Sequence, residues 1–408
     1  MATDNPIFID LPDTPSNTPK TTVIQVIGVG GGGGNAVANM YRENIPGIRF
    51  SVCNTDAKQL NDSPVPDRLQ LGEGLGAGGR PELGQRLAEE SLDHIQEILH
   101  PDTDMLFITA GMGGGTGTGA APIIAREAKK KGILTVGIVT IPFCFEGNRK
   151  IDIALDGLEQ VRKEVDTLLV INNERLRQIY ADYTIRSAFQ KADDTLTKAV
   201  SSIVEIINMR GIQNLDFRDV DTCLRKGGVA VMSSGTAAGE GRLEQAIEAA
   251  LYSPLLNKSD IFRSKSIRIA LFFPPEGPNA MRMDELDDMN RFMQKFQTDI
   301  DAKFGYAEDE TLTNEIRVTL LAAGFRTPGE EATQEKDPKK DIRRELAYGG
   351  TDGKPIRHYR VHILQDDEMD NANLIAALED TPTYKRSEGK AQQLKEMAKG
   401  PKTEAEVV

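Results

Sequence analysis

The stretch VIQVIGVGGGGGN, residues 23–35, joins an apolar, β-rich run to a run of glycines and decides the fold. Residues 23–29 predict a buried strand, and residues 35–43 follow with helical character. Glycine lets backbone N–H groups approach an anion closely, and the N-terminus of the following helix adds partial positive charge. This order indicates a phosphate-binding loop; a tight turn without a ligand is the alternative.

Strand and helix patterns keep alternating beyond this loop. Apolar runs at 48–54, 105–110, 133–141 and 167–172 are separated by helical patterns at 81–99, 121–131 and 151–163. Such alternation predicts an α/β fold built on a doubly wound parallel sheet, with ligands at the carboxyl ends of its strands.

A long central helix is predicted over residues 186–209, where apolar residues recur at i, i+3, i+4 and i+7. Its broad apolar stripe predicts burial between two domains. Strand patterns at 229–233, 266–273 and 316–323, with helical patterns at 241–251 and 283–302, predict a smaller α+β second domain. The expected division is a disordered extension (1–21), a nucleotide-binding domain (22–185), the central helix (186–210), the second domain (211–325), a linker (326–380) and a disordered C-terminal tail (381–408).

The composition excludes several classes of protein. Lys and Arg number 49 against 62 Asp and Glu, and the net charge of −13 argues against nucleic acid as a partner. Three cysteines without a C-x-x-C pair exclude a disulfide scaffold and a zinc ribbon, and fit a reducing cytosol. No apolar stretch approaches the roughly 20 residues of a membrane span, so a soluble protein without membrane insertion is expected.

A second glycine run, GMGGGTGTGAAP at residues 111–122, also lies between a strand and a helix. Two such loops on neighbouring strands would converge on one polyanion. No Walker P-loop occurs, and Thr116 and Thr118 can donate hydroxyl hydrogen bonds where its lysine is missing. A third glycine segment, residues 72–79, either closes over the site or is a flexible surface loop.

The first loop also has an alternative interpretation. Gly28-x-Gly30-x-x-Gly33 matches the dinucleotide fingerprint, and Asp56 lies at the spacing of a ribose contact. An NAD-dependent oxidoreductase is therefore the alternative function, but it leaves the second glycine loop without a role.

The GGGTGTG core at residues 113–119 resembles the signature of the tubulin/FtsZ family, and residues 22–325 are similar to the bacterial cell-division GTPases of that family. The resemblance implies a polymerising GTPase that assembles head-to-tail filaments and organises the division ring at mid-cell in the cytoplasm. A tubulin-like filament protein with a non-division role, or one that binds GTP without cleaving it, is a further possibility. Similar segments occur in order at 26–37, 54–56, 71–79, 107–122, 142–147, 214–220 and 253–256.

The resemblance also implies which residues bind GTP or GDP. Glu146 and Thr140 would contact the ribose, and Asn173 and Asp193 would read guanine. A carboxylate can accept both N1–H and N2–H₂ of guanine, which adenine cannot offer. Mg²⁺ would bridge phosphate oxygens without a dedicated set of protein ligands. The phosphates would be held by Gly31, Gly32, Gly33, Gly34, Asn35, Gly114, Gly115, Thr116 and Gly117.

Two more positions bear on the nucleotide. Phe189 precedes Asp193 by four residues and shares its helical face, so it is placed to stack on the base. Read without the family, Phe189 is a core residue and Asp193 a solvated one. Lys150 stands where the family often has arginine, and lysine supplies charge without a bidentate fork.

An acidic loop, NLDFRD at residues 214–219, follows the long helix. Asp216 and Asp219 are three apart, so on a helical turn both carboxylates face one way and can orient an attacking water. Asp216 as a simple helix N-cap is the alternative. In the resembling family this loop, with Asn214, enters the nucleotide site of the next subunit.

The length of the central helix supports a shared site. About 24 helical residues span roughly 36 Å, so the two half-sites meet only head to tail, in a contact that generates an open filament. Further copies of the chain are therefore the expected partner. The segment DTPTYKR at residues 380–386 resembles a peptide by which the family docks onto a membrane-tethering adaptor; an ordinary tail is the alternative.

Overall fold

The computed structural model describes residues 22–179, 183–251, 261–275, 277, 279–296 and 300–325. All of them belong to the first of two compact units, residues 1–330. The predictions for residues 1–21, 253–256 and 380–386, and for the linker and tail (326–380 and 381–408), fall outside the described residues.

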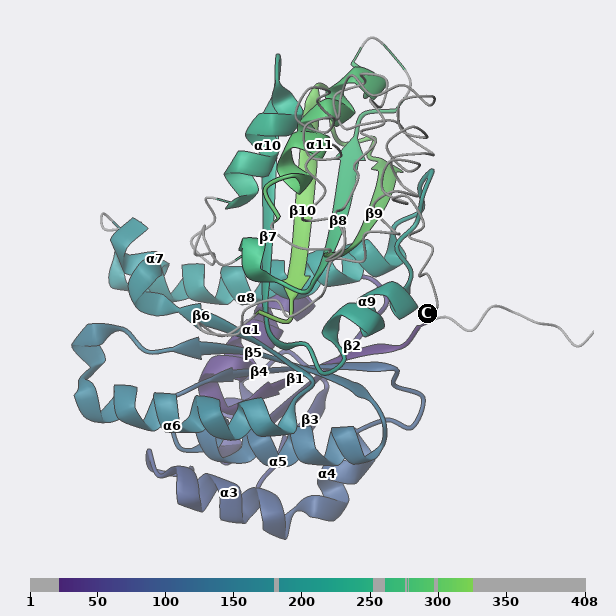
Figure 1. The fold of residues 1–408 in the computed structure, drawn as a ribbon. Coiled ribbons are helices and arrows are strands. Elements are labelled where there is room, and N and C mark those ends of the chain that lie inside the picture. The colour runs from purple at the N-terminus through teal and green to yellow at the C-terminus, as the bar shows by residue number, and fades with distance from the viewer. Residues whose placement is uncertain are drawn as a thin grey trace, which may run out of the picture. The chain divides into compact units, whose positions relative to one another are not determined.

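Ten strands form one sheet in the order β3-β2-β1-β4-β5-β6-β7-β10-β8-β9 (Figure 1). Strands β1 to β6 are parallel, which confirms the doubly wound prediction. Strand β7 pairs with β6 through only two residue pairs, and β10 runs antiparallel to both β7 and β8. The strands are β1 (Ile24–Val29), β2 (Ile48–Asn54), β3 (Asp67–Gln70), β4 (Met105–Gly111), β5 (Leu134–Ile141), β6 (Thr167–Asn172), β7 (Gly228–Ala238), β8 (Ser266–Phe273), β9 (Asp301–Glu308) and β10 (Glu315–Ala323).

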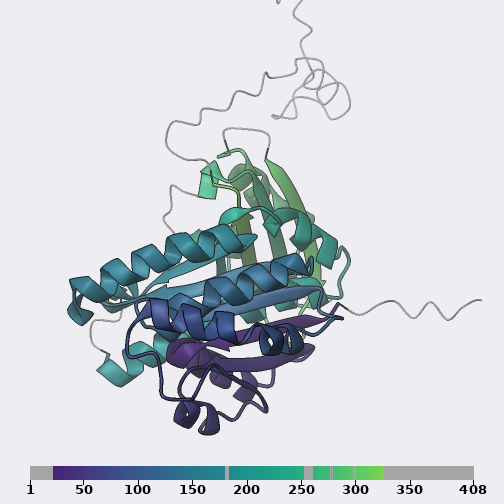
Figure 2. The ribbon, with the colours of Figure 1, turned by 90° about the horizontal axis from the view of Figure 1, so that it is seen from below.

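Helices cover both faces of the parallel half of the sheet, which consists of strands β1 to β6. Buried residues of α3 to α6 share one apolar cluster on one face, and those of α1 and α8 share another. Helices α10 and α11 cover the second half of the sheet, strands β7 to β10 (Figures 1 and 2). The helices are α1 (Gly30–Arg42), α2 (Ala57–Asn61), α3 (Pro81–Glu90), α4 (Leu92–Ile98), α5 (Thr116–Lys130), α6 (Asn148–Glu164), α7 (Asn173–Ile179), α8 (Ile185–Asn208), α9 (Phe217–Leu224), α10 (Arg242–Leu251) and α11 (Leu286–Met293); short 3₁₀ turns are η1 (Cys144–Glu146), η2 (Ile261–Arg263) and η3 (Met283–Glu285).

Helix α8 is the predicted central helix, and its burial between the two halves is confirmed. Its apolar stripe, including Leu196 and Ile203, belongs to one cluster with Val136 of β5 and Leu321 of β10. Apolar side chains from both halves of the sheet therefore pack on the same helix. A bidentate ion pair at 2.7 Å from Arg317 of β10 to Glu205 of α8 reinforces this packing.

Four predicted helices differ from the structure. Helix α1 starts five residues early, within the first glycine run, and α5 starts at Thr116, five residues before the predicted residue 121. The pattern at 81–99 splits at Ser91, whose hydroxyl bonds back to the Leu87 carbonyl at 2.8 Å. The helix predicted over 283–302 exists but is too long: α11 ends at Met293, and β9 starts at Asp301 with alternating residues that signal a strand. Strand β3 and helices α2 and α7 were not predicted.

Within the described ranges, none of the helices combines the length and apolar character that a bilayer crossing demands.

Candidate nucleotide-binding site

A cavity of about 490 Å³ lies at the carboxyl ends of the parallel strands. Val29 at the end of β1, Asn54 at the end of β2 and Gly111 at the end of β4 all line it. This is the edge of the sheet where a doubly wound fold places its ligand, and the volume is that of a typical small-molecule site.

Most residues predicted to bind a nucleotide meet around this cavity. Gly33 and Gly34 do not line it. A Cβ on Gly33 would lie 2.1 Å from the carbonyl oxygen of Thr109, so this glycine is required for α1 to pack on β4. Gly34 borders a smaller neighbouring cavity of about 220 Å³. The predicted residues that line the main cavity are Gly31, Gly32, Asn35, Gly114, Gly115, Thr116, Gly117, Thr140, Glu146, Lys150, Asn173, Phe189 and Asp193.

Two helix N-termini open onto the cavity. Helix α1 begins at Gly30, whose φ of +71° favours glycine, and α5 begins at Thr116. Neither helix has a side-chain hydrogen bond at its N-cap. Their first-turn N–H groups and partial positive charges are therefore available to an anion.

The side chains around the cavity supply little positive charge. Lys150 is the one basic residue among the described residues that line it, beside Asp56, Glu146 and Asp193. Lys150 is ion-paired with Glu146, which also accepts a hydrogen bond at 2.9 Å from the Phe143 backbone N–H. Attraction for a polyanion must therefore come largely from the main chain.

Two acceptors at the other end of the cavity lack donors within the described part of the chain. Asn173, the first residue of α7, is buried, and its Oδ1 has no hydrogen-bond partner among the described residues. Asp193 is half-buried, and burial, together with the nearby Asp194, raises its pKa to about 7. Burying acceptors without donors is costly. The pair fits a base that presents N–H groups, as guanine does.

One aromatic side chain, Phe189, lines the cavity and packs on a group of other aromatic residues. Phe189 is 42% exposed and packs edge-on against Phe143, with ring centroids 5.1 Å apart. Phe145 is 64% exposed and stacks on Phe143, with ring centroids 5.1 Å apart. The interpretation of Phe189 as a core residue is therefore wrong, and so is that of Asp193 as a solvated residue.

The structure adds lining residues that were assigned no role from the sequence, although several lie in the family-like segments 54–56 and 142–147. Asn54 donates to Gln59 at 2.8 Å, and the hydroxyls of Thr55 and Thr116 lie 2.6 Å apart. These residues line the cavity together with Pro142. Asn54 and Thr55 stand at the carboxyl end of a predicted strand, and that position is the signal that could have found them.

The third glycine segment lines the cavity from residue 76 to residue 79. It is held in place by a hydrogen bond of 2.8 Å from the Gly76 N–H to the Thr55 carbonyl.

Thr118, expected to offer its hydroxyl to the ligand, instead accepts the Gly113 N–H at 2.9 Å. The Asp56 carboxylate, considered for a ribose contact, caps α2 by accepting two backbone N–H groups.

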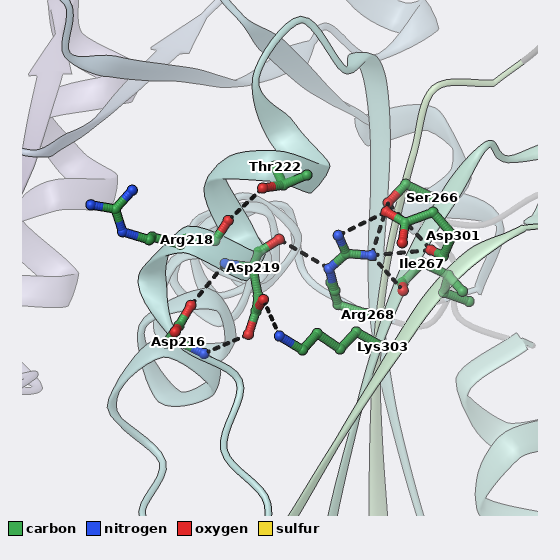
Figure 3. Close-up of polar contacts among 9 residues, drawn as sticks. All are labelled: Asp216, Arg218, Asp219, Thr222, Ser266, Ile267, Arg268, Asp301 and Lys303. Carbon is green, nitrogen blue, oxygen red and sulfur yellow. Dashed lines mark hydrogen bonds and ion pairs between the residues drawn. The ribbon is translucent and has the colours of Figure 1, made fainter.

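The acidic loop does not line the cavity. It lies beyond the far end of α8, beside α9, whereas α7 lies at the opposite side of the molecule (Figure 1). Asp216 is the N-cap of α9, as the alternative interpretation proposed: its carboxylate accepts the Asp219 N–H at 3.0 Å, and Asp219 returns the same bond to the Asp216 N–H (Figure 3). Asn214 accepts the Gly211 N–H at 2.8 Å.

Asp219 is the more enclosed of the two acids. Burial alone would raise the pKa of its carboxyl, but the Lys303 ammonium and the Asp216 N–H outweigh burial and hold that pKa below its usual range. Within the described part of the chain, no group of three or more His, Cys, Asp or Glu residues is placed to hold a metal ion.

Three protein-family models match the sequence. The GTPase domain of the tubulin/FtsZ family matches residues 23–181, the C-terminal domain of the FtsZ family matches residues 228–326, and a further FtsZ C-terminal model matches residues 356–401. The cell division protein FtsZ of Porphyromonas gingivalis is 46% identical over 392 residues, covering 90% of this chain and 85% of that protein. That of Azotobacter vinelandii is 43% identical over 317 residues, covering 76% and 79%.

Solved structures agree. An empty FtsZ dimer from M. jannaschii is 37% identical, with a TM-score of 0.67 over 74% of this chain and 88% of that one. CetZ2 from Haloferax volcanii, in a GTPγS-bound protofilament, has a TM-score of 0.63 over 79% of this chain and 97% of that one, but at 19% identity it shows the fold alone. With a GTPase domain and an FtsZ C-terminal domain matched in order along one sequence, the chain belongs to the tubulin/FtsZ family of GTPases, and within it to the FtsZ family.

Proposed function

We propose that this protein is a polymerising GTPase of bacterial cell division, which assembles head to tail and hydrolyses GTP where two subunits meet. One observation carries the proposal: in a chain of this family, the nucleotide cavity and the acidic loop lie at opposite ends of α8. The sixteen helical residues from Asp193 to Asn208 already span about 22 Å. The acidic loop therefore serves the cavity of another subunit.

The cavity binds GTP and GDP in this proposal, with the phosphates on the two glycine loops and the base at Asn173 and Asp193. Phe189 stacks on the base, while Glu146 and Thr140 bind the ribose and Lys150 the ribose or a phosphate. The open N-termini of α1 and α5 and the donor-less acceptors at Asn173 and Asp193 support this orientation. Mg²⁺ would neutralise part of the phosphate charge, and among the described residues no cluster of side chains is placed to hold it.

The catalytic contribution comes from the next subunit. Asp216 and Asp219, with Asn214 beside them, approach the phosphate end of the neighbouring nucleotide and orient the attacking water. A head-to-tail contact that does not close on itself generates a filament. Hydrolysis then depends on assembly, and loss of the γ-phosphate weakens the contact.

Further parts of the chain have proposed roles. Residues 22–185 form the GTP-binding domain and residues 211–325 the second domain, joined by the central helix 186–210. Residues 326–380 act as a linker, and residues 381–408 dock onto a membrane-tethering division adaptor at mid-cell. Residues 356–401 match an FtsZ C-terminal model, so the proposed docking peptide lies within a segment typical of this family.

Deleting residues 381–408 tests the docking role. The truncated protein should keep its GTPase activity and lose its place at the division site. Retained localisation in a fluorescent fusion would refute the docking role.

The two alternative functions agree less well with the observations than the polymerising GTPase does. An NAD-dependent oxidoreductase does not fit a chain of this GTPase family whose Asp56 is engaged in capping α2. A tubulin-like protein with a non-division role is disfavoured by 46% identity to a cell division protein.

Removing the Asp216 carboxylate tests the shared site. Asp216→Ala should abolish GTP turnover and leave GTP binding nearly intact, but it also removes a helix cap worth about 1 kcal/mol. Asp216→Ser keeps a capping hydroxyl without the carboxylate and should be equally inactive. If the serine variant hydrolyses GTP at the parent rate, the shared-site proposal is wrong. Turnover per molecule of the parent should also rise with protein concentration, and a flat dependence would point to a self-contained enzyme.

A further inference from the structure

Two basic side chains from the second half of the sheet close around Asp219 (Figure 3). Arg268 on β8 and Lys303 on β9 are paired in the register of the two parallel strands. The Arg268 Nε donates to the Asp219 carbonyl at 2.9 Å, and the Lys303 ammonium is ion-paired with the Asp219 carboxylate. One cross-strand pair of residues on β8 and β9 thus binds both the backbone and the side chain of Asp219.

Every polar atom of Asp219 has a partner. Its N–H and its Oδ2 are bonded to Asp216, its carbonyl to Arg268 and its Oδ1 to Lys303. Asp216 differs, because it is exposed and only one of its carboxylate oxygens accepts a bond from a described residue. Of the two acids, Asp216 is therefore the one left free to face another molecule.

Arg268 is rigidly held in turn. Its side chain is 3% exposed, and its guanidinium donates to the Asp301 carbonyl at 3.0 Å, the Asp301 carboxylate at 2.9 Å and the Ser266 hydroxyl at 2.9 Å. A buried cation is tolerated only when its donors are satisfied in this way. The Asp219 carbonyl is therefore bonded to a side chain that is itself fixed to β8 and β9.

We infer that Lys303, backed by Arg268, is a positioning residue for GTP hydrolysis: it holds Asp219, and through the reciprocal capping bonds the first turn of α9, so that Asp216 is presented to the neighbouring subunit's nucleotide. The inference rests on the proposed function. Lys303 has a second effect, because two carboxylates brought to a triphosphate repel it. A lysine paired with one of them offsets part of that repulsion.

The charges around Asp219 give the inference a pH signature. Figure 3 shows Arg218 directed away from the Asp219–Lys303 pair, so Lys303 is the cation that contacts the carboxylate. Without Lys303, only the Asp216 N–H and the charge of Arg268 would oppose burial, and the pKa of Asp219 would rise. The charged groups that face or flank Asp219 are Asp216 and Arg218 from its own segment, Arg268 from β8, and Asp301 and Lys303 from β9.

Three variants of the full chain test the inference. Lys303→Met removes the charge from a side chain that is 46% exposed and tolerates replacement; Lys303→Arg keeps the charge, and Lys295→Met alters another exposed lysine of the same half. Phosphate release is measured per sedimented subunit between pH 5.5 and 8, alongside GTP affinity. This normalisation separates hydrolysis from changes in assembly.

Lys303→Met should hydrolyse GTP roughly tenfold more slowly at pH 7 with unchanged GTP affinity, a part of the hundredfold that a 1 Å misplacement can cost. The acid limb of its pH–rate profile should move to higher pH, while Lys303→Arg and Lys295→Met follow the parent. An unchanged rate and profile in Lys303→Met would overturn the inference, as would a slower rate without a shift in the profile. If Asp216→Ser is inactive in the same assay, such a result leaves the proposed function standing; an active Asp216→Ser would remove the proposed function itself.

Discussion

Replacing Asp193 with asparagine is expected to change the stability and the nucleotide affinity of the protein in opposite directions. In the folded, nucleotide-free chain, burial and the nearby Asp194 raise the pKa of Asp193 from 3.8 to about 7. The folded protein then keeps a proton at pH values where the unfolded chain has lost it. The free energy of unfolding therefore falls as the pH rises from about 4 to 7, and the full cost is present above pH 7.

The size of the effect follows from the same two values. The difference between 3.8 and about 7 corresponds to about 4 kcal/mol, which is the upper limit of what the substitution can recover. An amide in this position is also partly desolvated, so we expect Asp193→Asn to raise the free energy of unfolding by about 2 kcal/mol at pH 7.5. The gain should shrink as the pH is lowered toward 4.

The affinity for GTP should fall at the same time. Hydrogen bonds to a charged group contribute about 1.5 to 3 kcal/mol each, and losing two of them weakens binding by about 10² to 10⁴. Xanthosine triphosphate, which carries a carbonyl where guanine has its 2-amino group, can accept from the introduced amide. Its affinity should therefore fall less than that of GTP, or rise.

Urea unfolding of the nucleotide-free protein at pH 6 and 7.5, together with titrations of both nucleotides, measures these effects. Asp194→Asn is the matched control, because it removes the neighbouring charge and should leave GTP affinity near that of the parent. The reasoning fails if Asp193→Asn is less stable than the parent at pH 7.5, or if it binds GTP as tightly.

Two further substitutions test the packing and the base contact. Gly33→Ala should destabilise the fold by about 3 kcal/mol in chemical unfolding, because its Cβ would overlap the Thr109 carbonyl oxygen at 2.1 Å, whereas Gly34→Ala, with nothing within 4 Å, should be neutral or mildly stabilising. Equal effects from the two alanines would contradict the packing account. Phe189→Ala should weaken GTP binding about tenfold by removing a stacking surface, with little change in unfolding, since the ring is 42% exposed; unaltered affinity would remove Phe189 from the site.

Much of the sheet could be predicted because its strands are local patterns. The apolar runs at Ile48–Asn54, Thr167–Asn172 and Ser266–Phe273 are buried strands with the bounds that the sequence indicated. The start of α1 was missed because five glycines carry no helical periodicity, and their helical state is imposed by packing on β4. Strand β9 was missed because the helical pattern before it was extended into its first two residues, and the alternation that follows was not recognised as a strand.

The candidate site, like the fold, has residues that a local motif predicts and residues that only tertiary structure brings together. The cavity residues were found where a motif marks a strand end, as at Gly115 and Thr116. The partners of Asp219 carry no such mark, because Arg268 and Lys303 lie 49 and 84 residues away along the chain. Their meeting depends on the pairing of β8 with β9, a tertiary relation that no local pattern contains.

The contrast between the two ends of the cavity has a consequence for how the protein senses its surroundings. Main-chain amides at the starts of α1 and α5 do not titrate, so their contribution to phosphate affinity is the same at acidic and at neutral pH. At the other end the proposed acceptor for guanine is Asp193, whose carboxyl must lose a proton before it can accept a hydrogen bond from the base. Binding of GTP below about pH 7 would then release a proton. A fall in cellular pH would reduce the discrimination in favour of guanine before it reduced the affinity for the phosphates.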